Sequence, residues 1–203
     1  MELLKKLKTE EKINKMDKSM IRKQIYAYRN SLSDKFVDEN SKKIFEKIID
    51  SDWYKETKYV FLYASYNNEV DTKWFFEYSL SLGKIVCAPK VSVDDTNLCK
   101  MNFYKISSFS DFMEGYKGIP EPVEGLENVD DYTNEAIIII PMVAFNEDRT
   151  RIGYGKGFYD RYLASHSFKK IVGVAFEGQK VENIQKNPFD ISPEIIYTEE
   201  GIY

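Results

Sequence analysis

The stretch AIIIIPMVAFNEDRTRIGYGKGFYDR, residues 136–161, decides how the rest of the chain is interpreted. It begins with an apolar run, Ala136–Phe145, that predicts a strand buried on both faces. A glycine-rich loop follows, and a helix is predicted to begin near Phe158. A second apolar run, KKIVGVAF at Lys169–Phe176, predicts the next strand. Strand, helix and strand in this order are typical of a parallel sheet.

The first half of the chain repeats this order. KYVFLYAS at Lys58–Ser65 and KIVCAPKV at Lys84–Val91 are short apolar runs that predict two further buried strands. Between them a helix is predicted to begin at Asp71 or Thr72 and to end at Gly83. This alternation predicts an α/β fold in which a mostly parallel sheet is flanked by helices.

The segments around this pattern are predicted to be helical or irregular. Upstream, apolar spacing predicts one helix that ends near Leu32 and a second helix, capped by Ser33, whose apolar face continues to Ile49. Residues 102–135 show little periodicity and predict a long, partly ordered crossover between the two halves.

Composition limits the classes of protein. A formal net charge of −4 and 43% hydrophobic residues predict one globular domain with its own core and argue against disorder. The longest apolar run is about half of the roughly 20 residues that a membrane span needs. Because the N-terminus also lacks the features of a secretory signal, a cytoplasmic location without membrane contact is expected. The acidic balance argues against nucleic acid as a partner.

The cysteines and the histidine exclude common kinds of chemistry. Cys87 and Cys99 lack metal-binding spacing and are predicted to be two half-buried thiols. His166 is the one histidine of the chain, and it is predicted to lie near the C-terminal end of a short helix rather than in a catalytic triad. We therefore expect chemistry that does not depend on histidine.

The glycine loop predicts an anion site. Residues 153–157 carry glycine at every second position, and glycine can adopt positive φ and turn successive N–H groups toward one phosphate. Arg151, Lys156 and Arg161 add positive charge to the loop. The spacing fits neither the P-loop nor the dinucleotide fingerprint. On this pattern alone, a flexible hairpin without a ligand is the alternative.

Carboxylates accompany two predicted strand ends. Asp160 falls in the first turn of the predicted helix, where it either interacts only with the helix dipole or, beside a polyphosphate, binds Mg²⁺. The polar residues NNEVD, 67–71, follow the predicted strand at Lys58–Ser65. Ligands of open parallel sheets bind beyond the carboxyl ends of the strands, so a site is expected at these two ends.

Six motifs occur in the order and spacing of a known family. They are KxxxR at Lys18–Arg22, EVDT at Glu69–Thr72, GIPEP at Gly118–Pro122, PMVAF at Pro141–Phe145, RIGYGKGFYDRYL at Arg151–Leu163 and VGVAFEGQ at Val172–Gln179. Together they span almost the whole chain. On these motifs the chain resembles the 5-formyltetrahydrofolate cyclo-ligases, also called methenyltetrahydrofolate synthetases.

The resemblance implies an enzyme, a ring-forming C–N ligase. Members use ATP and Mg²⁺ to convert 5-formyltetrahydrofolate into 5,10-methenyltetrahydrofolate, with release of ADP and phosphate. The implied mechanism is phosphorylation of the formyl oxygen followed by ring closure through N10. The resemblance also implies the three-layer α/β sandwich shared with sugar-phosphate isomerases and CoA transferases, and a monomer is expected.

Site residues are carried over by position. The resemblance implies Lys156, Arg151 and Tyr159 as catalytic residues and Asp160 as the magnesium ligand. The residues implied in ATP binding are Lys18, Arg22, Arg151, Ile152, Gly153, Tyr154, Gly155, Lys156, Gly157, Phe158 and Tyr159. The residues implied in folate binding are Ala64, Tyr66, Glu69, Tyr154 and Phe158. Glu69 is expected to grip the pterin, because a carboxylate accepts two parallel N–H bonds from its edge.

The chain departs from the family pattern in places. Phe158 stands where several members have tyrosine, so a hydroxyl contact is absent there. Thr150 replaces a glycine, and the loop is expected to be stiffer at that point. Pro193 stands where some members have a second acidic metal ligand, which leaves that ligand unassigned. Residues 1–16 lie outside the resemblance and are expected to extend a single domain at 17–203.

Two alternatives stay open. The first is a diverged relative that acts on another formyl or acyl compound, and the presence of Glu69 argues against it. The second is a non-catalytic module that holds ATP or folate. The complete set of phosphate and metal residues, Lys18, Arg22, Lys156 and Asp160, argues against that module. Turnover with ATP distinguishes an enzyme from a module.

Overall fold

The computed structural model describes residues 17–93, 99–115 and 118–203 of the chain, and the expected extension at 1–16 lies outside this part. The helices are α2 (Lys18–Ser31), α3 (Asp34–Ile49), α4 (Asp52–Glu56), α5 (Lys73–Ser81) and α6 (Phe158–Ser165), with 3₁₀ turns η1 (Phe109–Asp111), η3 (Asp130–Glu135) and η4 (Glu177–Gln179). The strands are β1 (Tyr59–Leu62), β2 (Ile85–Val93), β3 (Cys99–Ile106), β4 (Phe112–Glu114), β5 (Pro120–Pro122), β6 (Ala136–Pro141), β7 (Ala144–Phe145), β8 (Arg151–Ile152), β9 (Lys170–Val174) and β10 (Ile195–Tyr197).

The main sheet has the strand order β10-β9-β6-β1-β2-β3. All neighbours are parallel except β2 and β3, which confirms the mostly parallel sheet. The partly ordered crossover predicted at 102–135 contains most of β3 and the hairpin of β4 with β5, which the sequence did not predict as strands. In β3, buried Met101 and Phe103 alternate with half-buried Asn102 and Tyr104, as an edge strand with one covered face requires.

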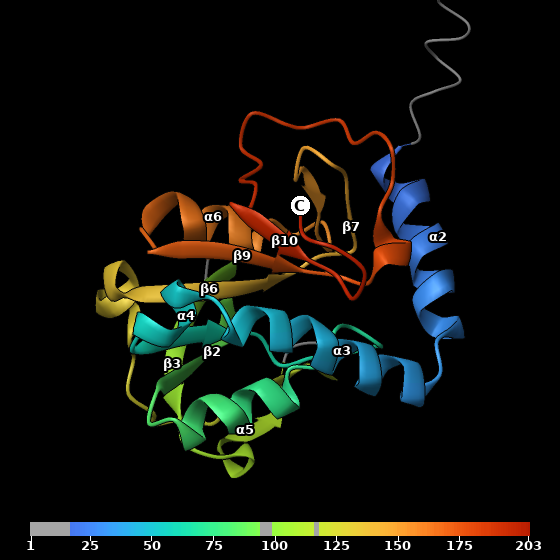
Figure 1. The fold of residues 1–203 in the computed structure, drawn as a ribbon. Coiled ribbons are helices and arrows are strands. Elements are labelled where there is room, and N and C mark those ends of the chain that lie inside the picture. The colour runs from blue at the N-terminus through green and yellow to red at the C-terminus, as the bar shows by residue number, and fades with distance from the viewer. Residues whose placement is uncertain (1–16, 94–98, 116–117) are drawn as a thin grey trace, which may run out of the picture.

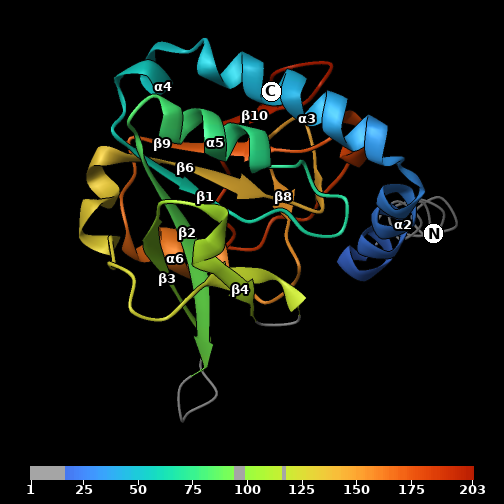
Figure 2. The ribbon, with the colours of Figure 1, turned by 90° about the horizontal axis from the view of Figure 1, so that it is seen from below.

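Helices cover both faces of the sheet, so the domain has three layers (Figures 1 and 2). Strand β1 is buried along its whole length, and its side chains alternate between two cores. Val60 and Leu62 join the core that also contains residues of α3, α4 and α5, while Tyr59 and Phe61 join the core that contains Leu163 of α6. Burial on both faces explains why the central strands are apolar runs in the sequence.

The apolar run at Ala136–Phe145 forms two strands rather than one. β6 ends at Pro141, and β7 pairs with β8 in a separate two-stranded sheet. The side-chain amide of Gln179 donates to the carbonyls of Met142 at 2.8 Å and Val143 at 2.9 Å. These bonds satisfy two backbone acceptors at the point where the chain leaves the main sheet.

Helix α2 lies beyond the carboxyl ends of the central strands rather than over either face (Figure 2). Ile21 and Ile25 pack with Ile152 of β8, so α2 rests on the β7–β8 hairpin. The predicted cap of the next helix is confirmed, because the Phe36 N–H donates to the Ser33 hydroxyl at 3.2 Å. Among the described helices, none is both long and apolar enough to cross a membrane.

Candidate functional site

A cavity of about 430 Å³ lies where α2, the glycine loop and the ends of β1 and β6 meet. All the residues that the resemblance implies in binding or catalysis line this cavity: Lys18, Arg22, Ala64, Tyr66, Glu69 and the continuous run from Arg151 to Asp160. An apolar wall is formed by Pro89, Val91, Met101, Ile119 and Pro120. Strands β2 and β3 and the edge of the β4–β5 hairpin, which the sequence did not place near a site, supply this wall.

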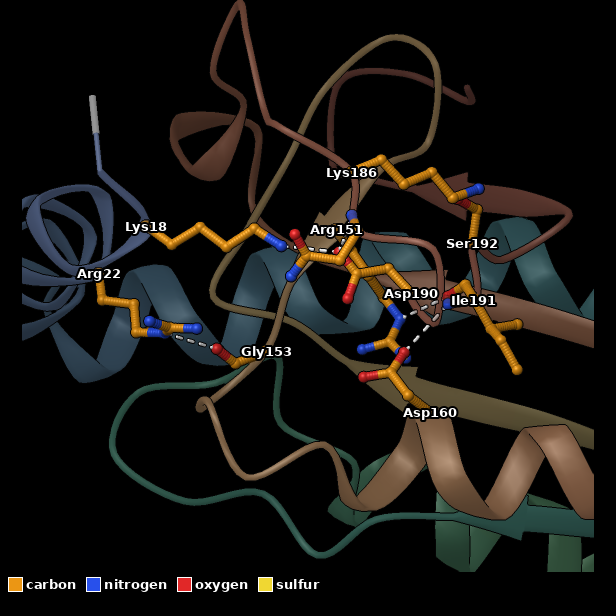
Figure 3. A network of polar contacts seen from close by, with 10 residues as sticks. Lys18, Arg22, Arg151, Gly153, Asp160, Lys186, Asp190, Ile191 and Ser192 are labelled. Carbon is orange, nitrogen blue, oxygen red and sulfur yellow. Dashed lines mark hydrogen bonds and ion pairs between the residues drawn. The ribbon is translucent and has the colours of Figure 1, made fainter. Parts of the chain in front are cut away.

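Arg151 and Asp160 form an ion pair at the base of the glycine loop (Figure 3). Arg151 is 5% exposed, and its Nη2 lies 2.6 Å from Asp160 Oδ1. The same oxygen accepts the Ile191 N–H at 3.1 Å, and Arg151 Nε donates to the Ile191 carbonyl at 3.1 Å. Burial lowers the pKa of Arg151, and the charge of Asp160 opposes that shift. Asp160 Oδ1 therefore joins the glycine loop to the segment at Ile191.

Helix α2 supplies two cations to this side of the cavity (Figure 3). Lys18 Nζ lies 2.7 Å from Asp190 Oδ2, and Arg22 Nε donates to the Gly153 carbonyl at 2.8 Å. Burial raises the pKa of Asp190, but the hydrogen bonds from Lys18 and the Asn187 N–H outweigh it, so the pKa falls below its usual value. We call Lys18, Arg22, Arg151 and Lys156 the cationic side of the cavity.

The glycine loop has backbone geometry that a side chain would disfavour. Gly155 has φ of 92° and Gly157 has φ of 64°. Gly157 is the N-cap residue of α6, and no side chain caps this helix end. The N–H groups in the first turn of α6 can therefore bind an anion. Lys156 is exposed between the two glycines, and its carbonyl accepts a hydrogen bond from Arg161 at 2.8 Å.

Glu69 is buried in the cavity beside the loop. It is 7% exposed, and its Oε2 accepts the Tyr66 N–H at 3.0 Å. The Tyr154 hydroxyl of the glycine loop donates a hydrogen bond to Oε1. Burial raises the pKa of Glu69, while the charge of Arg29 opposes this shift. Burial and the neighbouring Glu69 raise the pKa of Tyr154, so this phenol keeps its proton as a donor. We call residues 66–69 the acidic turn.

The sequence analysis missed two charged residues of this region. Asp190 lies far from Lys18 in the chain, within an irregular tail, and no local pattern marks it. Arg29 is a buried residue of α2 whose guanidinium bonds Tyr154 and the acidic turn. It stands seven residues after Arg22, about two helical turns, so it lies on the same face of α2. That spacing was the available signal for Arg29.

The histidine prediction is confirmed, and the cysteine prediction needs a correction. His166 ends α6, where its ring stacks on Tyr162 at 4.1 Å between centroids, and it does not line the cavity. Cys87 is fully buried rather than half-buried, because β1 and β3 flank its strand, and burial raises the pKa of its thiol. The side chain of Cys99 lies outside the described part of the chain.

Comparison with known proteins identifies the family of the chain. The model of the 5-formyltetrahydrofolate cyclo-ligase family matches residues 14–199. The chain is 28% identical to a probable 5-formyltetrahydrofolate cyclo-ligase of Caenorhabditis elegans, over 91% of this chain and 94% of that protein. It is 30% identical to the 5-formyltetrahydrofolate cyclo-ligase of Mycoplasma pneumoniae, over 91% of this chain and all of the relative.

Solved structures show the same fold. The 5,10-methenyltetrahydrofolate synthetase of Aquifex aeolicus superposes with a TM-score of 0.78 at 31% identity, covering 92% of each chain. The synthetase of Mycoplasma pneumoniae gives a TM-score of 0.70 at 27% identity, covering 89% of this chain and 98% of that one. Because the family model spans nearly the whole sequence, this chain belongs to the 5-formyltetrahydrofolate cyclo-ligase family, enzymes of folate one-carbon metabolism.

Proposed function

We propose that this chain converts 5-formyltetrahydrofolate into 5,10-methenyltetrahydrofolate, with ATP converted to ADP and phosphate. The observation that carries the proposal is the joining of two recognition elements in one cavity. The cationic side and the glycine loop suit a polyphosphate, and buried Glu69 suits the N–H edge of a pterin. Tyr154 belongs to the glycine loop and hydrogen-bonds Glu69, so the two elements are adjacent.

The reaction has two steps. The formyl oxygen on N5 attacks the γ-phosphorus of ATP, the bond to ADP breaks, and an imidate phosphate forms. N10 then adds to the same carbon, loses its proton, and phosphate leaves as the methenyl bridge closes. The protein does little covalent work here, because positioning and neutralisation of phosphate charge dominate phosphoryl transfer.

The cationic side would stabilise the transferring phosphate. Lys156 is exposed at the loop tip, where its ammonium can contact the γ-phosphate throughout the transfer. Arg151 and Arg22 are held by Asp160 and the Gly153 carbonyl, which fixes their guanidinium groups before ATP arrives. Fixed charges of this kind need no reorganisation during the reaction.

The remaining lining groups would orient the folate. Glu69 would accept the 2-amino and ring N–H groups of the pterin, with Ala64 and Tyr66 beside it. Tyr159 is a phenol whose pKa is raised by burial and by Glu69, so it stays a neutral hydroxyl near the reacting centre. Phe158 offers an apolar surface in place of a hydroxyl.

The carboxylates of the cavity fit Mg²⁺ bound together with ATP. Among the described residues, no cluster of three or more His, Cys, Asp or Glu would hold a metal unaided. Mg²⁺ needs only one or two carboxylates when phosphate and water complete its shell. Asp160 uses Oδ1 for its protein contacts, and Asp190, whose pKa also responds to Arg151, is the second carboxylate nearby. Bound there, Mg²⁺ would neutralise charge on the polyphosphate.

An absorbance assay tests the proposal. Purified protein is mixed with 5-formyltetrahydrofolate, ATP and Mg²⁺, and the near-ultraviolet band of the methenyl product is followed, with ATP omitted as the control. We expect the band to grow only with ATP and to match the ADP formed. Binding of both ligands without the band would indicate either a relative that acts on another formyl compound or a non-catalytic module.

The state of the protein in the cell stays a prediction. We expect a monomer, which light scattering after size-exclusion chromatography measures directly. We also expect a cytoplasmic location, which fractionation of the source cells would test.

A further inference from the structure

Arg29, the buried arginine of α2, is not among the residues assigned to ATP, folate or Mg²⁺. Arg29 is 1% exposed, so its N–H groups need partners inside the protein. Its Nε donates to the Asn68 carbonyl at 3.1 Å, and its Nη2 donates to the carbonyls of Tyr66, at 3.0 Å, and Asn67. Its Nη1 donates to the Tyr154 hydroxyl at 2.9 Å. One guanidinium therefore binds three successive carbonyls and a phenol.

Those three carbonyls belong to the acidic turn. Asn67 and Asn68 have φ of 48° and 52°, in the left-handed region that asparagine tolerates better than most residues. Two such residues in a row direct the neighbouring carbonyls toward Arg29. Asn68 Nδ2 in turn donates to the Arg29 carbonyl at 2.9 Å. The turn and α2 thus hold each other in place.

Both hydrogen-bond partners of the Glu69 carboxylate are bound by Arg29. Tyr66 gives its N–H to Glu69 Oε2 and its carbonyl to Arg29. Tyr154 donates its hydroxyl proton to Glu69 Oε1 and accepts from Arg29. Removing the guanidinium would leave three carbonyls of the turn without this donor and would free both groups that orient Glu69.

We propose that Arg29 is a positioning residue that fixes Glu69 for pterin recognition by holding Tyr66 and Tyr154. This inference rests on the proposed function, since it takes Glu69 to bind the folate. Arg29 acts through its neighbours, so its loss should affect the folate more than ATP.

Steady-state kinetics of Arg29→Met test this role, with Lys23→Met on the exposed face of α2 as the matched control. We expect the folate KM to rise at least about tenfold, because the donors that orient buried Glu69 are released, with a much smaller change in the ATP KM. Arg29→Lys should recover only part of the loss, because an ammonium lacks the planar fork. Equal changes in both KM values, or an unchanged folate KM, would overturn the proposal.

Hydrogen exchange of the ligand-free protein separates this proposal from the proposed function. The amides of residues 64–72 should exchange faster in Arg29→Met than in wild type or Lys23→Met. If Arg29→Met does not fold, Arg29→Lys serves in the same comparison. If the wild-type protein shows no turnover but Arg29→Met still exchanges faster, the proposed function is contradicted and the positioning of the turn is supported. If the wild-type protein shows turnover but Arg29→Met exchanges at the wild-type rate, only the positioning role is overturned.

Discussion

The glycine loop and the acidic turn both contain left-handed backbone, yet they sustain it differently. In the loop it falls on Gly155 and Gly157, which lack the Cβ that would clash. In the turn it falls on Asn67 and Asn68, whose carbonyls are bound by a buried guanidinium. A permissive backbone leaves the loop free to adapt to phosphates, whereas hydrogen bonds hold the turn in one geometry before any ligand arrives.

The charged groups of the two regions also have different kinds of partner. Two cations of the cationic side already contact acids, Arg151 at Asp160 and Lys18 at Asp190. The carboxylate of Glu69 accepts instead from a phenol and a backbone N–H, which are neutral donors. The cationic side is therefore partly neutralised in the free protein, while burial disfavours the charge of Glu69 until donors of the ligand reach it.

The largest effect is expected from the one member of the cationic side that sits at the exposed loop tip. Lys156→Ala should lower kcat by about 10²- to 10³-fold, because the transferring phosphate loses a counter-charge in a partly desolvated site. The measurement is kcat at saturating ATP and folate, with Lys23→Ala as a control for the loss of one positive charge. Near-wild-type turnover would show that the other residues of the cationic side stabilise the transferring phosphate without Lys156.

A smaller and more selective effect is expected at the acidic turn. Glu69→Gln should raise the folate KM roughly 10- to 100-fold, because charge-assisted hydrogen bonds to the pterin are lost. The ATP KM should change little, since the phosphates meet the cationic side. Titration of each substrate at saturation of the other measures both constants. Equal changes would mean that the two regions do not recognise separate substrates.

A several-fold effect is expected from the acid that neutralises the cationic side. Asp160→Asn should shift the Mg²⁺ titration of activity to higher concentration, because an amide is a weaker ligand for a hard cation. The titration is run at fixed ATP, with Asp38→Asn, an exposed position of α3, as the control. An unchanged Mg²⁺ requirement would mean that Asp160 holds Arg151 and the Ile191 N–H and does not bind the metal.

The parallel core of the fold could be predicted because burial on both faces leaves a plain mark in the sequence. Strands β1 and β6 are continuous apolar runs for that reason. Edge strand β3 and three-residue β10 were missed, since one alternates between polar and apolar residues and the other is too short to show a period. The carbonyls after the break at Pro141 are bound by Gln179, a side chain whose contacts no local pattern reveals.

Some residues of the candidate site could be predicted from the sequence and others could not. The residues that the resemblance implies in binding or catalysis all line the cavity. Asp190 and Arg29 act through partners that are distant in the chain, and the long separations leave no local signal for their contacts. Spacing along α2 marks the face that carries Lys18, Arg22 and Arg29, but only the fold shows that the acidic turn lies against it.

The smallest expected effect is on stability, and its sign should differ between the two regions. The pKa of Asp190 is lowered in the folded protein, so its contribution is present above its unfolded pKa and is lost as pH falls through the folded value. The pKa of Glu69 is raised by burial, so its contribution is present below the unfolded pKa of about 4.5 and is lost as pH rises through the folded value. From acid to neutral pH, Asp190→Asn should therefore lose stability relative to wild type, and Glu69→Gln should gain. Urea unfolding across this range measures both trends. The change in the free energy of unfolding caused by Asp190→Asn should stay within about 1 kcal/mol, because the ion pair of Asp190 is partly exposed. Parallel trends would show that the two carboxylates are held in the same way and would remove the contrast between the regions.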